Sequence, residues 1–161
     1  MKRLLSASAV IVAAVLMSAA PASAQTVRMR ATLSSGEETP TALLSGAVGT
    51  AEFSVDTTNN EIGVDLRVFN LPTGTTAGHI HVGPRGVSGP VVIDFPIPTG
   101  RTGDLAMTFR IGLAQFHARP EIGINTIQDA IQAIVLGNAY ANIHTSQNPG
   151  GEVRGQLTTA P

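Results

Sequence analysis

The sequence predicts an all-β sandwich or barrel with one short helix. Short apolar runs alternate with polar residues along the chain, as half-buried strands do. The 17 glycines and 10 prolines are spread between these runs, where turns are needed. One stretch, residues 126–136, instead spaces its apolar residues as a helix does.

The strands are predicted by alternation of apolar and polar side chains in four runs: 51–55, 62–68, 91–95 and 105–111. A polar turn at 57–60 joins the first two runs into a hairpin with one buried face. Pro96 and Pro98 follow the third run, and proline is excluded from central strands. We therefore expect 91–95 to lie at the edge of a sheet.

The helix over 126–136 is placed by its apolar face and its ends. Ile127, Ile131 and Ile134 fall on one side of a helix. Asn125 or Thr126 can cap its first turn, and Gly137-Asn138 can end it. We expect this helix to cover an end or a flank of the sandwich.

The last two predicted strands, 139–144 and 152–157, select their own register. When His144 faces Glu152, Asn142 faces Arg154 and Tyr140 faces Gln156, every polar residue falls on one face. The other face then carries Ala141, Ile143, Val153 and Leu157. We expect the apolar face to enter the core and the polar face to meet solvent.

Residues 1–24 have the three parts of a secretory signal peptide. Lys2 and Arg3 precede an apolar run over 4–17, and small residues lead up to Ala24. We expect cleavage between Ala24 and Gln25, which leaves one domain over 25–161 in the periplasm or outside the cell. No cysteine is present for a lipid anchor, so no membrane attachment is expected after cleavage.

Charge and composition exclude several classes of function. Removal of Lys2 and Arg3 lowers the basic count from 10 to 8 against 11 acidic residues, a net charge of −3. This balance does not favour nucleic acid as a partner. The absence of cysteine excludes disulfides, thiolate metal sites and thiol nucleophiles. Neither a G-x-S-x-G nor an H-E-x-x-H motif occurs, so we do not expect an enzyme.

Three of the four histidines are candidates for metal ligation. His79 and His81 flank Ile80 at strand spacing, so both point away from the core, and His144 lies on the polar face described above. Imidazole is the usual ligand of copper and zinc where thiolate is missing. Two interpretations stay open: a hydrogen-bonded histidine network, or a three-histidine copper or zinc site.

Other polar residues surround this candidate site. Glu152 is expected to orient His144 or to complete the ligand set, and Tyr140 and Asn142 share its face. His117 is expected in an exposed loop, and Arg85 at the exposed tip of a turn over 83–90. Metal binding would weaken as the pH falls through the imidazole pKa, about 6.5 when unperturbed.

Two motifs resemble the CHRD domain, the module named for the extracellular protein chordin. They are AGHIHVG at 77–83 with GxxGPVV at 86–92, and AYANIHTSQNPGGEVRGQL at 139–157. The resemblance implies a secreted, immunoglobulin-like Greek-key β-sandwich. Chordin's growth-factor binding is not implied, because the cysteine-rich modules that accompany the domain there are missing.

The sequence thus leaves two main functions. The first is a binding or structural module for an extracellular or cell-surface partner; the resemblance itself implies little about activity. The alternative is a copper or zinc binding protein that uses His79, His81 and His144. An enzyme is a remote third possibility.

Overall fold

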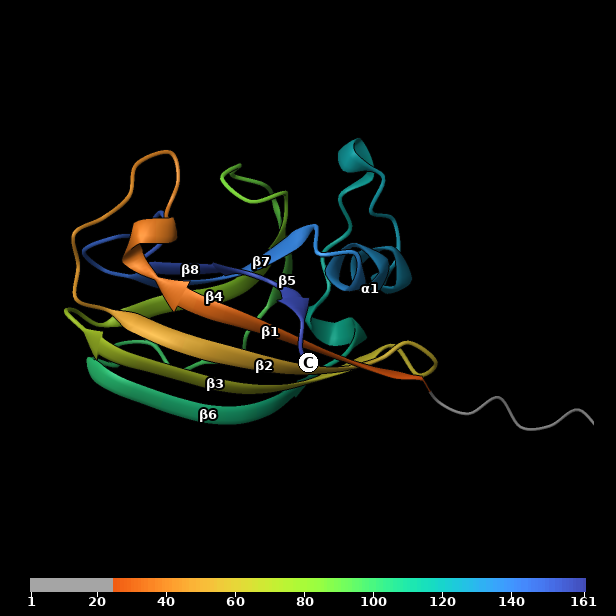
Figure 1. The fold of residues 1–161 in the computed structure, drawn as a ribbon, viewed down its shortest axis with the longest axis horizontal. Helices are drawn as coiled ribbons and strands as arrows, with labels where there is room; N and C mark the ends of the chain where they lie inside the picture. Colours follow the sequence, from red (N-terminus) through yellow and green to blue (C-terminus); the bar gives the residue numbers. More distant parts are fainter. Residues whose placement is uncertain (1–24) are drawn as a thin grey trace, which may run out of the picture.

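The alternating runs form strands that join into one curled antiparallel sheet (Figure 1). The computed structural model describes residues 25–161, so the expected signal peptide (1–24) and its cleavage at Ala24-Gln25 lie outside the described residues. The strands are β1 (Thr26–Ser34), β2 (Val48–Asp56), β3 (Glu61–Leu71), β4 (Thr75–Val82), β5 (Val91–Asp94), β6 (Gly103–Ile111), β7 (Ala139–Thr145), β8 (Val153–Gln156) and β9 (Thr158–Thr159). Short 3₁₀ turns occupy Ser35–Glu37, Leu113–Gln115 and Pro120–Ile122.

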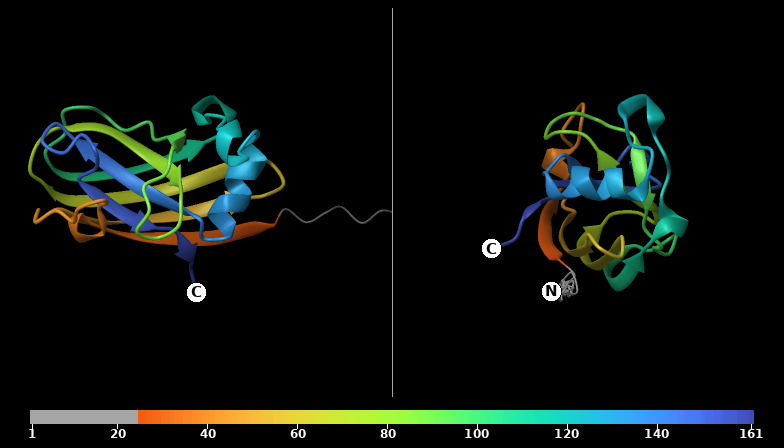
Figure 2. Two further views of the ribbon diagram at one scale, coloured as in Figure 1. Left: turned by 90° about the horizontal axis from the view of Figure 1, so that it is seen from above. Right: turned by 90° about the vertical axis from the view of Figure 1, so that its right-hand side faces the viewer.

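The strand order is β5-β4-β7-β8-β1-β2-β3-β6, with β9 beside β1. The sheet curls until its two halves, β5-β4-β7-β8 and β1-β2-β3-β6, face each other around a shared apolar core (Figure 2). The all-β prediction is confirmed, and β5 lies at the sheet edge as its following prolines require. The two layers are continuous through β8 and β1, where Ser34 pairs with Arg154.

The helix α1 (Ile127–Val135) lies across one end of the curled sheet (Figure 2). Thr126 caps it, since its hydroxyl accepts the Asp129 backbone N–H at 3.2 Å while the Asp129 carboxylate accepts the Thr126 N–H at 2.8 Å. Gly137, with φ of 75°, ends it. Ile127, Ile131 and Ile134 are buried against the sheet, so the helix expected over 126–136 is confirmed.

The register expected for β7 and β8 is confirmed, because Tyr140 pairs with Gln156 and Asn142 with Arg154. The expectation that the polar face meets solvent is wrong: every residue of β7 and β8 is buried. Two loops cover that face. We call them the Glu38 loop (residues 35–47) and the Gly89 loop (residues 83–90).

The two covering loops are fastened to each other as well as to the sheet. Thr39 and Ser88 share a hydrogen bond of 2.7 Å, and Arg85 forms an ion pair with Glu37. Arg85 is exposed, as expected, but its guanidinium bridges to the other loop. From below, the Arg154 guanidinium donates to the Thr39 hydroxyl at 2.6 Å. The polar face of β7 and β8 is therefore covered by two loops that are fastened to it and to each other.

Candidate metal centre

The three histidines are placed together by strand pairing. His79 and His81 lie on β4, and His144 lies on the neighbouring strand β7, where Ala77 is its partner. Residues two apart on a strand share a face. The pairing therefore brings all three rings to the polar face, while Ile80 and Ile143 point into the core with no exposed surface.

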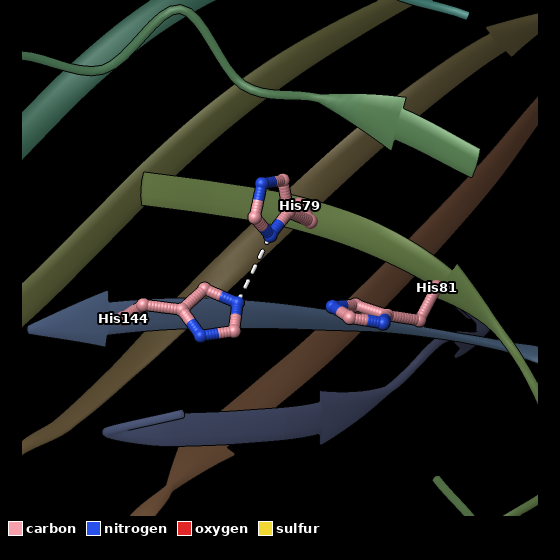
Figure 3. A group of neighbouring side chains, drawn as sticks. All are labelled: His79, His81 and His144. Carbon is pink, nitrogen blue, oxygen red and sulfur yellow. Dashed lines mark hydrogen bonds between the residues drawn. The ribbon is translucent and has the colours of Figure 1, made fainter. Parts of the chain in front are cut away.

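The ring nitrogens converge on one point (Figure 3). One ligating atom from each of His79, His81 and His144 lies within 4.8 Å of the other two. His79 Nδ1 is 2.9 Å from His144 Nε2. The distance between two nitrogens on a metal, at about 2.0–2.1 Å each, is roughly 3.3–3.6 Å. The separations within the cluster, from 2.9 Å up to 4.8 Å, bracket this range.

Backbone carbonyls determine which nitrogen two of the rings present. His81 Nδ1 lies 2.9 Å from the Gly89 oxygen, and His144 Nδ1 lies 3.0 Å from the Pro149 oxygen. A carbonyl only accepts hydrogen bonds, so each Nδ1 must carry the proton in the neutral ring. Each Nε2 then carries a lone pair that faces the cluster. His81 Nε2 is buried and has no hydrogen-bond partner among residues 25–161.

Burial keeps the rings neutral. Burial, with a smaller contribution from the neighbouring histidines, lowers the pKa of both His81 and His144 to about 4. Burial also lowers the pKa of His79, although the Asp94 carboxylate opposes this. Neutral imidazole is the form that ligates a metal. Protonation of His81 and His144 in the metal-free protein therefore falls well below the pH of about 6.5 expected for unperturbed rings.

The residues predicted to surround the site lie close to it, and each contacts a different group. Tyr140 stacks on His81, with ring centres 4.8 Å apart and planes within 8°. The Arg154 guanidinium lies 3.4 Å from the centre of the same tyrosine ring. Asn142 donates to the Glu38 carboxylate at 3.5 Å. These residues form the floor and wall beside the imidazoles.

Glu152 has a different role from the predicted one, which was to orient His144 or to complete the ligand set. Its carboxylate accepts from the Thr145 hydroxyl at 2.8 Å and from the Asn148 amide at 2.6 Å. The ring of His144 is oriented by the Pro149 oxygen instead. Glu152 thus holds the loop that carries this carbonyl, because Asn148 directly precedes Pro149.

Sequence reasoning missed Asp94 as a site residue. It pairs with His79 across β4 and β5, and its Oδ1 lies 3.6 Å from His79 Nε2. Its other oxygen lies 2.7 Å from Nε2 of His117, which sits in an exposed loop as expected. A register shift between His81 and Ile80 breaks the simple pairing of these strands, so alternation alone does not place Asp94 beside His79.

The model of the CHRD domain matches residues 29–157. The chain belongs to the CHRD family. The region of the chain that matches runs from β1 to the end of β8 and includes the three clustered histidines. No curated protein and no solved structure gave a significant match. Among residues 25–161, no helix is long and apolar enough to cross a membrane.

Proposed function

We propose that this CHRD protein is an exported metal-binding module, and that His79, His81 and His144 hold one copper or zinc ion. The observation that carries the proposal is the convergence of three neutral imidazoles whose ligating nitrogens lie within 4.8 Å of one another. Two of these rings are oriented by carbonyl oxygens on their outer nitrogens, an arrangement typical of metal-ligating histidine.

The donor set favours copper over zinc. Three nitrogen ligands suit both ions, and a fourth position stays open to water in either case. Among divalent first-row ions, Cu²⁺ binds a given nitrogen site most tightly. We therefore expect copper to displace zinc from the cluster, with zinc bound when copper is scarce.

Binding rather than catalysis is the proposed role. Arg154, beside the imidazoles, donates to Thr39, Pro84 and Val87 and so fastens the covering loops to the sheet. This pattern supports a holder of ions in the periplasm or outside the cell. An extracellular or cell-surface partner that receives the ion fits the same role.

Calorimetric titration of the protein with Cu²⁺ and with Zn²⁺ at pH 7.5 tests the proposal. We expect one ion per chain, and a loss of at least 100-fold in affinity in the His81→Ala and His144→Ala variants. His117→Ala is the comparison variant: this fourth histidine lies outside the cluster, so its variant should still bind one ion, with an affinity lowered by less than 10-fold. Absence of saturable heat in the wild-type protein would overturn the proposal.

A further inference from the structure

His79 differs from the other two imidazoles in having a carboxylate near one ring nitrogen, where each of the others has a backbone carbonyl. Its Nδ1 faces His144 Nε2 at 2.9 Å, and its Nε2 faces Asp94 Oδ1 at 3.6 Å. It is also the most accessible of the three, with 20% of its side chain exposed. No backbone carbonyl is hydrogen-bonded to either nitrogen within the described chain, so its tautomer depends on its side-chain neighbours.

The metal-free protein requires one particular tautomer of His79. The Pro149 oxygen keeps the proton of His144 on Nδ1, which leaves His144 Nε2 as an acceptor. The 2.9 Å contact is then a hydrogen bond that His79 donates from Nδ1. In this state His79 Nδ1 has no lone pair for a metal ion.

Ion binding therefore requires a change of tautomer at His79. Nδ1 must release its proton so that its lone pair meets the ion, and Nε2 must take up a proton. No net proton is gained or lost by the ring, and the charge of the donor set does not change. The proton on Nε2 points at the Asp94 carboxylate, which is the natural acceptor for it.

Asp94 is held in place for this contact. The Phe95 N–H, next along the chain, donates to the Gly78 oxygen at 2.8 Å and ties β5 to β4. The second carboxylate oxygen faces His117 Nε2 at 2.7 Å. His117 is itself anchored through its backbone N–H, which donates to the Val92 oxygen at 2.8 Å.

We propose that Asp94 is the positioning residue of the metal centre. Its carboxylate accepts a hydrogen bond from the Nε2–H group of His79 and thereby selects the tautomer that presents Nδ1 to the ion. The donor set is then Nδ1 of His79 with Nε2 of His81 and His144. His117 holds the second oxygen of Asp94 and supports the contact from outside. This inference rests on the proposed function.

Zn²⁺ binding by Asp94 variants of the whole protein tests the inference. We expect Asp94→Asn and Asp94→Ala to lower the affinity by 10- to 100-fold, the usual effect of removing a carboxylate behind a ligating histidine. His117→Ala should lower it by less than 10-fold. Asp104→Asn is the matched control, because it removes the same charge from an exposed carboxylate that binds the Asn70 N–H, and it should bind Zn²⁺ as the wild-type protein does.

Nitrogen-15 NMR of the imidazoles supplies a readout that loss of stability would not change. With Zn²⁺ bound, we expect the wild-type protein to show His79 ligated through Nδ1 and protonated at Nε2. In Asp94→Asn, the Nε2 proton should exchange faster with water and the population ligated through Nδ1 should fall.

The outcomes separate this inference from the proposed function. A wild-type protein that binds no ion overturns both. One bound ion with unchanged affinity and unchanged His79 signals in Asp94→Asn overturns the inference alone. Two bound ions, of which only the second is lost in the Asp94 and His117 variants, would also overturn it, because Asp94 would then be a ligand of its own site.

Discussion

The two halves of the curled sheet bury their strands in different ways. In β1, β2 and β3, residues alternate between buried and partly or fully exposed along most of each strand, so one face meets the core and the other meets solvent. In β7 and β8 every residue is buried. Alternation of side chains therefore reveals which face is polar, but not whether that face is covered.

The two halves also differ in the surroundings of their polar side chains. On the outer face of the open half, charged side chains form exposed pairs such as Arg67 with Asp65 and Arg110 with Glu61. Such pairs contribute little to stability. On the covered half, His81 and His144 are desolvated, loop carbonyls constrain their tautomers, and burial lowers their pKa values. The covering loops thus convert a polar sheet face into a candidate metal centre.

The largest expected effect concerns the core that both halves share. Ile143 in the covered half and Leu66 in the open half have no exposed surface. Replacement of either by alanine should lower the free energy of unfolding by about 2–5 kcal/mol, because each leaves a cavity. Urea denaturation measures this. A clearly smaller loss for Ile143→Ala would show that the covered half packs loosely on the core.

The second expected effect is a pH dependence of folding stability that comes from Glu38, on a loop of the covered half. Burial, with a smaller contribution from Glu152, raises the pKa of Glu38 from 4.5 to about 7 against the opposing effects of Arg154 and Asn142. A carboxyl whose pKa is higher in the folded protein stabilises the fold below pH 4.5, and this stability is lost as the pH rises through 7.

Glu38→Gln removes this pH dependence. Between pH 5 and pH 8, the wild-type protein should lose on the order of 3 kcal/mol relative to the variant. Urea denaturation of both proteins at the two pH values, each without metal, makes the comparison, and the histidine contributions cancel because both proteins share them. Parallel pH profiles would mean that Glu38 is ionised in the folded protein at both pH values.

A smaller effect distinguishes the covered polar face from the open one. The Gln156 amide donates to the Gly83 oxygen at 3.0 Å and to the Gly137 oxygen at 2.8 Å. Gln156→Ala leaves both carbonyls without this donor and should cost about 1–3 kcal/mol. Thr50→Ala, on the exposed face of β2, should stay within about 0.5 kcal/mol. Thermal denaturation measures both variants, and equal losses in their free energy of unfolding would contradict the difference between the faces.

Much of the fold is predictable because local physics determines it. Period-two alternation locates the strands, and the 57–60 turn follows from Asp56, whose carboxylate accepts the N–H groups of Thr58 and Asn59 at 2.9 Å. The register of β7 and β8 follows from keeping polar residues on one face. The covering of that face is not predictable this way, because it depends on contacts such as Thr39 with Ser88 between distant loops.

The candidate site is predictable only in part for the same reason. Alternation places His79, His81 and His144 on one face, and the structure brings them together. The groups that orient them come from turns and from an irregular strand pair: Gly89, Pro149 and Asp94. Two of these act through backbone oxygens, which every residue type supplies, so side-chain chemistry carries no signal for them.

The most direct test of the metal centre uses Tyr140, the one tyrosine in a chain without tryptophan. Because its ring stacks on His81, a Cu²⁺ ion held by the three imidazoles lies close enough to quench its fluorescence. Titration of the protein with Cu²⁺ should quench the emission in a saturable manner that ends at one equivalent, and His144→Ala should abolish that saturable phase. Quenching that rises without saturation, or that is the same in His144→Ala, would contradict a metal centre at this site.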